Sequence, residues 1–290
     1  MTDRRCCYTD GMVIVLALGS AIVYGVSDYV GGRASRRRPP ILVALAAELV
    51  ILVITVATVP FIETDGPTAR AVWWGIVGGV AGSSGVLGLY AALSRGNMTV
   101  VAPVTGIVAA IVPVLVGFGL GERPSSAATA GIALAIVAVA LIGGIAGVGH
   151  QSVAAETVLG AAVVGAAFGL LFVAYSRTGD DAGLWPLLMS RAGATPLLLG
   201  AFVVARRRGQ VPELGAQVMV PGAVIGVLIL AANGLYLVAA RDGLLSVVAV
   251  LVALYPASTV ALAAWLDHER ASRWQVAGMG LAAIGVTLIV

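Results

Sequence analysis

The chain has no lysine and few charged residues of any kind. All 17 of its basic residues are arginine and 14 residues are acidic, so that 11% of the 290 residues are charged and 60% are hydrophobic. Average globular proteins are about 25% charged and roughly 45–50% apolar. The chain therefore has too little polar surface to cover a soluble globule, and we expect a membrane protein. The absence of lysine also excludes any mechanism that needs a lysine amine.

Cysteine and histidine are equally scarce. The only cysteines are the adjacent Cys6 and Cys7, so no disulfide framework or redox motif is expected. The two histidines, His150 and His268, fall in predicted loops, and no His-Glu-x-x-His zinc motif is present. A phosphate-binding Gly-x-x-x-x-Gly-Lys-Ser/Thr loop is also missing. We therefore expect no cofactor or metal, and the net charge of +3, spread over loops, predicts no nucleic-acid partner.

Apolar runs of membrane-spanning length follow one another along the chain. A bilayer core of about 30 Å requires roughly 20 apolar residues in a helix, and we count about ten such runs. The predicted spans are Gly11–Val30, Ile41–Ile62, Ala71–Leu93, Met98–Leu120, Ala127–Val148, Val158–Tyr175, Leu184–Ala205, Val218–Ala240, Leu244–Trp265 and Trp274–Val290. The loops between them are short, so consecutive helices should be antiparallel neighbours.

The second half of the chain repeats the first with a fixed offset of 147 residues. The matching pairs include Gly96 and Gly243, Val100 and Val247, Glu122 and Glu269, Ser125 and Ser272, and Gly131 and Gly278. Because each half holds an odd number of spans, the two copies must lie in opposite orientations. Inverted repeats are the plan of many secondary transporters, which form their site where the halves meet. We predict an all-α integral membrane protein of two inverted five-helix repeats, residues 1–150 and residues 151–290.

The arginines of the loops favour one orientation by a narrow margin. Ten lie on the face that carries the first-to-second and seventh-to-eighth loops, and six lie on the other face. Cytoplasmic loops carry an excess of basic residues, so this count places both termini outside. The family resemblance described next favours the opposite orientation, and the side of the termini stays open.

Two five-helix copies with a Gly-Glu-Arg-like ending of the fourth helix resemble the EamA domain of the drug/metabolite transporter superfamily. The motif reads Gly121-Glu122-Arg123 in the first copy and His268-Glu269-Arg270 in the second. The stretch Tyr24–Gly32 resembles the first helix of one bacterial branch, and Tyr255-Pro256 and Arg191 are also typical. The resemblance implies export of amino acids, other metabolites or drugs across the bacterial cytoplasmic membrane.

Asp28 is one of three ionisable residues inside predicted spans. Such residues are costly in a membrane and are functional candidates by default. Asp28 shares a helix face with Tyr24 and Gly31 and has Ser27 as its neighbour. This stripe could line a water-accessible cavity, in which the carboxyl group could exchange a proton while substrate passes. Alternatively, Asp28 lies near the membrane surface and caps the loop Arg33–Arg38. Both interpretations stay open.

Glu48 and Arg191 are the other two ionisable residues inside predicted spans. Glu48 lies well inside the second span, where the resembled family often carries an arginine. Arg191 is its approximate counterpart in the seventh span, 143 residues on. We predict that the two side chains pair across the repeat interface. Arg191 is also the better candidate for an anionic group such as a substrate carboxylate, because its guanidinium fork suits one.

Further polar residues within the spans are candidates for substrate binding. They are Tyr90 in the third span, Asn233 and Tyr236 in the eighth, and Tyr255 and Ser258 in the ninth. The complete predicted substrate-binding set is Tyr24, Ser27, Asp28, Tyr90, Arg191, Asn233, Tyr236, Tyr255 and Ser258. Asp28, Glu48 and Arg191 form the set of candidate coupling or structural charges.

Together these features predict a secondary transporter or facilitator, and not an enzyme. It would export a small metabolite, amino acid-like or a drug, through a central site between the repeats of a multi-pass protein in the cell membrane. Its expected partners are the substrate and the lipid bilayer, and proton coupling is a hypothesis that rests on Asp28 and Glu48. The alternatives are a membrane-embedded enzyme with those two residues as a carboxylate pair, and a structural or sensor protein. The substrate, the direction and the oligomeric state are not specified by the sequence.

Overall fold

The computed structural model describes residues 6–63, 65–93, 98–144 and 154–290, and within these ranges the chain is helical, without a strand. The helices are α1 (Cys6–Ser35), α2 (Pro40–Ile62), α3 (Ala69–Leu93), α4 (Met98–Gly119), α5 (Ser126–Ile142), α6 (Ala155–Ser176), α7 (Trp185–Arg207), α8 (Ala216–Asp242), α9 (Leu245–Ala253), α10 (Tyr255–Leu266) and α11 (Arg273–Ile289). A 3₁₀ turn, η2 (Asp180–Ala182), precedes α7. The predicted all-α class is confirmed.

Ten apolar helical segments account for the ten predicted spans of the described chain. Eight are long and apolar enough to cross a membrane, with α9 and α10 counted as one segment, Leu245–Leu266. The other two, α5 and α11, are shorter apolar helices of 17 residues each. Helices suit a bilayer because they satisfy their backbone hydrogen bonds internally.

Most bounds agree with the prediction within about three residues, and three segments differ in a more informative way. α1 exceeds the predicted span Gly11–Val30 at both ends and ends at Ser35, shortly before Pro39 and Pro40. The ninth span is broken at Leu254, and Pro256 lies in the first turn of α10, where its missing N–H leaves no hydrogen bond unmade. α5 ends at Ile142, short of the predicted Val148. The predicted boundary between the repeats, at residues 150 and 151, lies outside the described residues.

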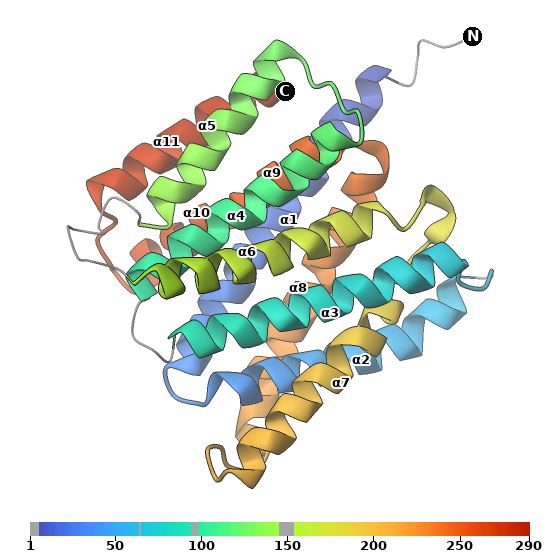
Figure 1. Ribbon diagram of the computed structural model, residues 1–290, viewed down its shortest axis with the longest axis vertical. Coiled ribbons are helices and arrows are strands. Elements are labelled where there is room, and N and C mark those ends of the chain that lie inside the picture. The colour runs from blue at the N-terminus through green and yellow to red at the C-terminus, as the bar shows by residue number, and fades with distance from the viewer. Residues whose placement is uncertain (1–5, 64, 94–97, 145–153) are drawn as a thin grey trace.

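The helices form two layers that the inverted repeat relates to each other (Figure 1). In this view α4, α6 and α3 follow one another in front, and α10, α1 and α8 lie behind them. The main contacts between the copies come in equivalent pairs: α6 packs on α3 and α4, as α1 packs on α8 and on α9 and α10. Equivalent helices also meet directly, α2 with α7 at one edge of the molecule and α5 with α11 at the opposite edge. A two-fold axis in the membrane plane produces this pattern.

The two ends of the helix bundle are tied by different contacts. We call the end with the α4–α5 and α8–α9 loops the Glu122 end. There, Glu122 accepts hydrogen bonds from the backbone N–H groups of Leu245 and Ser246 at 2.6 and 2.9 Å, so it caps the start of α9. Glu63 in the same way accepts one from Leu184 at 2.6 Å, which ties the α2–α3 loop to the start of α7.

We call the opposite end, with the α1–α2 and α10–α11 loops, the Arg33 end. Two ion pairs join these loops, Arg33 with Asp267 and Arg36 with Glu269, the latter at 3.3 Å. Glu269 is the repeat counterpart of Glu122, yet its side chain is 54% exposed. Equivalent carboxylates thus form a partly buried helix cap at one end and a surface ion pair at the other.

Glycines let the helices of the two copies approach closely. A Cβ atom at Gly79 of α3 would overlap the backbone of Ser190 in α7, and one at Gly222 of α8 would overlap Ala46 of α2. Gly165 of α6 lies equally close to the backbone of α4. Small residues are what membrane helices use to bring their backbones together, since lipid supplies no hydrophobic drive between helices.

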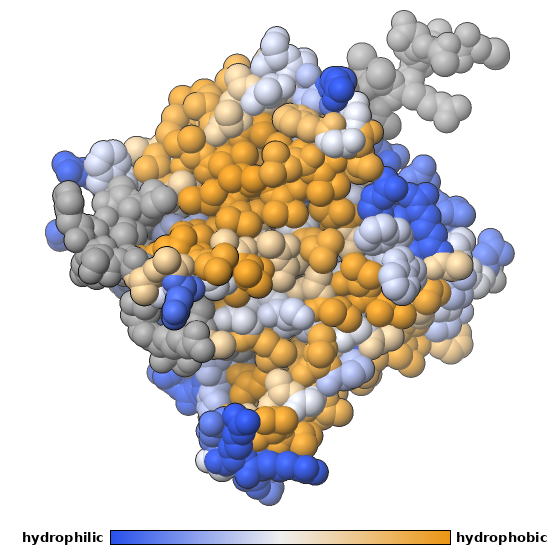
Figure 2. Space-filling model, in the orientation of Figure 1, coloured by the Kyte–Doolittle hydropathy of each residue, from blue (hydrophilic) through white to orange (hydrophobic). Residues whose placement is uncertain are grey.

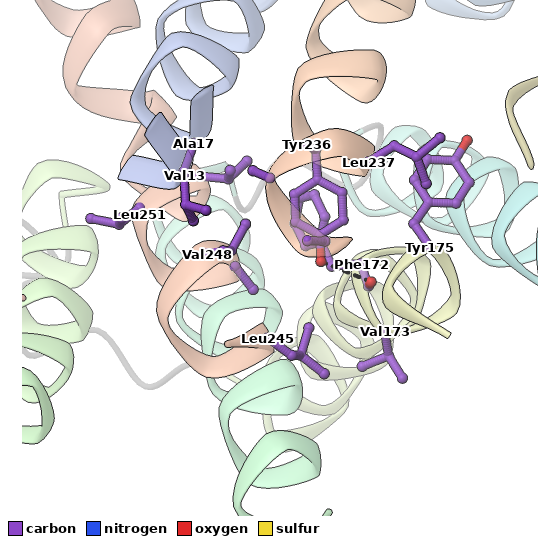
Figure 3. Packing of buried hydrophobic residues seen from close by; sticks show 14 of the residues in the cluster. Val13, Ala17, Phe172, Val173, Tyr175, Tyr236, Leu237, Leu245, Val248 and Leu251 are labelled. Carbon is purple, nitrogen blue, oxygen red and sulfur yellow. Dashed lines mark hydrogen bonds between the residues drawn. The ribbon is translucent and has the colours of Figure 1, made fainter. Parts of the chain in front are cut away.

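The outer surface is apolar and the core lies between the layers. Figure 2 shows hydrophobic residues over most of one face, with hydrophilic residues gathered toward its margins. Phe61, Val220 and Trp265 are 84%, 72% and 74% exposed, as expected for side chains in lipid. Toward the Glu122 end, the centre is filled by a cluster that includes Val13 of α1 and Val248 of α9 (Figure 3).

Candidate functional site

Asp28 lies on the inward side of α1 and is nevertheless exposed. One turn before it, Tyr24 contacts α8, and Gly25 packs against α10. At 3.6 residues per turn, Asp28 points between these two neighbours. Val15 and Ile22, which are 69% and 57% exposed, lie on the outer side of the same helix. The exposure of Asp28 therefore belongs to the interior of the bundle and not to its lipid face.

No described residue is paired with Asp28. Its carboxylate accepts no hydrogen bond and forms no ion pair within the described ranges. It lies close enough to Tyr24 of α1 and Tyr255 of α10 for its charge to act on both phenol groups. Asp28 stands about two turns before the end of α1, counted at 3.6 residues per turn. The arginines Arg33 and Arg36 beyond it are engaged by other acids, so Asp28 does not serve as their partner.

Tyr24 links three helices beside this carboxylate. Its hydroxyl group donates a hydrogen bond to Asn233 Oδ1 of α8 at 2.6 Å. Its ring lies 6.3 Å from the ring of Tyr255 in α10 and 6.4 Å from that of Phe172 in α6, the latter edge to face. Both tyrosines are partly exposed. Two aromatic faces and one unpaired carboxylate thus meet at the centre of the molecule.

A buried aromatic layer lies on the Glu122 side of Tyr24 (Figure 3). Tyr236 of α8 is fully buried and donates a hydrogen bond to the backbone carbonyl of Phe172 at 2.8 Å. Its ring lies 4.8 Å from Phe172 and 6.4 Å from Tyr175. With Val13 and Ala17 of α1, these rings fill the space between α1, α6, α8 and α9. These side chains close the interior of the bundle on the Glu122 side.

Glu48 and Arg191 form a buried ion pair where α2 meets α7. Arg191 Nη1 contacts Glu48 Oε2, and the two side chains are 8% and 5% exposed. The second carboxylate oxygen accepts a hydrogen bond from Thr195 at 2.7 Å, and Arg191 Nη2 donates to Ser190 Oγ at 2.8 Å. The contact predicted between the two charges is present. Arg191 is thereby occupied, so no guanidinium fork is free for a substrate in this state.

Hydrogen bonds connect this pair to the aromatic layer. Tyr175 donates to Ser190 Oγ at 3.0 Å, and Tyr175 packs on Tyr236. A chain of contacts therefore runs from Glu48 through Arg191 and Ser190 to the aromatic rings. A groove of about 520 Å³ along the seam of α2 and α7 reaches the outside of the pair. Its lining is Leu52, Leu188, Met189, Arg191, Ala192, Thr195, Pro196 and Leu199.

The structure brings most of the predicted site residues together. Tyr24, Asp28, Asn233, Tyr236 and Tyr255 gather around the centre, with Arg191 at the edge of the same network. The remaining predicted residues are placed differently. Ser258 donates to the backbone carbonyls of Tyr255 and Ala21, which fixes α10 on α1. Ser27 is buried at 2% exposure, and the side chain of Tyr90 lies outside the described residues.

Four residues of the network were missing from the prediction. They are Phe172, Tyr175, Ser190 and Thr195. The repeat offset could have indicated two of them, because Thr195 lies 147 residues after Glu48 and Tyr175 lies 147 residues after Asp28. Thr195, and not Arg191, is therefore the position equivalent to Glu48. Phe172 and Ser190 carry no such signal.

Inverted five-helix repeats define a multi-pass membrane protein, with an architecture that many secondary transporters share. The chain belongs to the EamA-like transporter family, whose model matches it twice, over residues 11–144 and residues 156–290. A solved structure described only as "Crystal structure of protein" shares the fold, with a TM-score of 0.75 over 97% of this chain and 96% of its own at 15% identity. No curated protein matches the chain.

Proposed function

We propose that this protein is a secondary transporter that exports a small metabolite across the bacterial cytoplasmic membrane. The substrate would enter from the Arg33 end through an opening between α1, α8 and α10 and would bind beside Asp28, Tyr24 and Tyr255. Asn233, which holds Tyr24, would fix the shape of this site. Transport would follow when the closed Glu122 end opens and the Arg33 end closes, as in other inverted-repeat transporters.

The observation that carries this proposal is the exposure of Asp28. A carboxylate on the inward side of a membrane helix is costly unless it meets water or a partner. Asp28 has no partner among the described residues and is exposed, which supports a water-accessible opening at this point. A structural or sensor protein has no need for such a group. The name of the family supports transport independently.

Proton coupling is the hypothesis for the driving force. Asp28 is the candidate carrier of the proton, and the titratable groups whose charge interacts with it are Tyr24 and Tyr255. Glu48 is the weaker candidate, because Arg191 and Thr195 occupy both of its oxygens.

The test begins with a metabolite screen that compares export by overexpressing and deletion strains. Any compound found is then followed in proteoliposomes with and without an imposed pH gradient. We expect uptake into vesicles that depends on the protein and rises with the gradient, and that is lost in Asp28→Asn but kept in Glu213→Gln, a surface acid paired with Arg206. Transport that ignores the gradient and survives Asp28→Asn would exclude proton coupling. If the protein transports no compound in either assay, the proposed transport function is wrong.

A further inference from the structure

We propose that the site at Asp28 recognises a positively charged nitrogen, so that the substrate is an organic cation or carries an ammonium group. This inference rests on the proposed function and names the substrate class of the same site. It excludes simple carboxylates, sugar acids and neutral sugars as the principal substrates.

The first support is that Asp28 has no partner of opposite charge. Of the three ionisable groups inside the spans, Glu48 and Arg191 neutralise each other and are buried. Asp28 is left unpaired among the described residues and is exposed. A carboxylate substrate would meet a like charge there, whereas a cation would supply the partner that Asp28 lacks. Of these three groups, the one without a partner among the described residues is therefore negative.

The second support is the pair of aromatic rings beside the carboxylate. The Tyr24 and Tyr255 rings lie 6.3 Å apart with an angle of 53° between their planes, and both are partly exposed. Cations bind over the faces of such rings, and quaternary ammonium groups are recognised in this way. The bond from Tyr24 to Asn233 and the contact with Phe172 fix the first ring before any ligand arrives. The site is therefore preorganised for a cation.

The arginines at the mouth do not reverse this preference. Arg33 and Arg36 are held by Asp267 and Glu269, and Arg206 is held by Glu213. Other arginines of this end, such as Arg37, Arg207 and Arg270, form no ion pair within the described residues but are exposed to solvent. The pairs are largely exposed and are screened by salt. The charge that a bound substrate meets is consequently set by Asp28.

Binding to the full-length protein in detergent provides the test, with small probes that share a phenyl ring and differ in charge. The probes are benzyltrimethylammonium, benzyl alcohol and benzoate, and the readout is the apparent Kd from isothermal titration. We expect benzyltrimethylammonium to bind at least tenfold more tightly than the other two. Asp28→Asn should remove that preference, Asp28→Glu should keep part of it, and Glu213→Gln should leave it unchanged. A permanent charge prevents the probe from crossing lipid unaided, so the same compound also serves in vesicles.

The result that would overturn the inference is benzoate or benzyl alcohol binding as tightly as the cation, or cation binding that Asp28→Asn leaves intact. The selectivity of the unmodified protein decides the question even if Asp28→Asn does not fold. Vesicle uptake separates this failure from failure of the proposed function. Uptake of neutral or anionic compounds, but not of cations, would refute cation recognition at Asp28 and leave the proposed transport function standing. Selective cation binding without transport of any solute would refute the proposed transport function and leave cation recognition at Asp28 standing.

Discussion

At the scale of single residues, the Glu48–Arg191 pair holds together two helices that would otherwise meet through apolar contacts. Both charges are nearly fully buried, and Thr195 and Ser190 satisfy their remaining hydrogen-bonding groups. A buried pair contributes less to stability than its distance suggests, because desolvation offsets the attraction. Loss of one partner is a different matter, since the other charge is then left alone in a medium that cannot solvate it.

Arg191→Met should therefore destabilise the protein more than the double variant Glu48→Leu with Arg191→Met. The single change is expected to cost about 3–5 kcal/mol, as for other buried pairs that lose one partner. Thermal unfolding in detergent measures both variants against the unmodified protein. Equal stability of Arg191→Met and the unmodified chain would show that Glu48 does not depend on this partner.

A second residue-scale effect concerns His268, which adopts a left-handed conformation with φ of 55° at the end of α10. Its repeat counterpart, Gly121, has φ of 92° at the end of α4. A residue with a Cβ atom pays about 1–2 kcal/mol in this region, and glycine does not. His268→Gly should accordingly raise the unfolding temperature. Gly121→Ala should lower it through backbone strain alone, because a Cβ atom there would meet nothing within 4 Å. A His268→Gly protein that unfolds at a lower temperature, or a Gly121→Ala protein that unfolds at a higher one, would contradict the assignment of strain.

At the scale of helices, close glycine contacts fix how the two copies interlock. α3 and α7 belong to different repeats, and Gly79 of α3 lies against the backbone of Ser190. Ser190 is also the residue that connects Tyr175 to Arg191. The approach of these two helices therefore positions part of the polar network.

Gly79→Ala should push α3 from α7 and lower stability by about 1–3 kcal/mol, the usual cost of overpacking. Gly200→Ala in α7 is the matched control, because its Cβ atom would meet nothing within 4 Å. Its stability should stay unchanged or rise, since alanine favours a helix over glycine. Unfolding temperatures in detergent compare the two. A Gly79→Ala protein as stable as Gly200→Ala would mean that the helices are not in backbone contact.

At the scale of the whole molecule, the central site should be open toward one side of the membrane only. The Glu122 side is filled by the aromatic layer and the α9 cap, while Asp28, about two turns from the Arg33 end of α1, is exposed. Among the described arginines, nine lie toward the Arg33 end and four lie toward the Glu122 end, which favours a cytoplasmic Arg33 end.

A membrane-impermeant thiol reagent should modify Asp28→Cys from one side only, in a chain whose Cys6 and Cys7 are replaced by serine. Ala17→Cys, fully buried in the same helix, is the control and should react from neither side. Right-side-out and inverted vesicles identify the side, and we expect the cytoplasmic one. Modification from both sides, or from neither, would be incompatible with a site open at the Arg33 end.

Much of this architecture follows from local properties that a sequence displays. Apolar length predicts the spans, and the 147-residue offset predicts the inverted copies. The Glu48–Arg191 contact was predictable because few ionisable groups lie within the spans and opposite charges there must find partners. The surroundings of Asp28 were not predictable in the same way. Whether it caps a loop or faces the interior depends on α8 and α10, which reach it through contacts more than 200 residues away in sequence. Phe172 and Ser190 are ordinary helix residues until their neighbours are known.

The hydrogen bond between Glu48 and Thr195 joins equivalent positions of the two repeats. In an assembly of two identical five-helix chains, that position would face its own copy across the axis. Two glutamates would repel each other, whereas two threonines could share a hydrogen bond. Glu48 is tolerated at this position because the equivalent position of the second repeat holds Thr195 and not a second glutamate. Joining both copies in one polypeptide thus allows a charge at the symmetry axis that a homodimer would have to avoid.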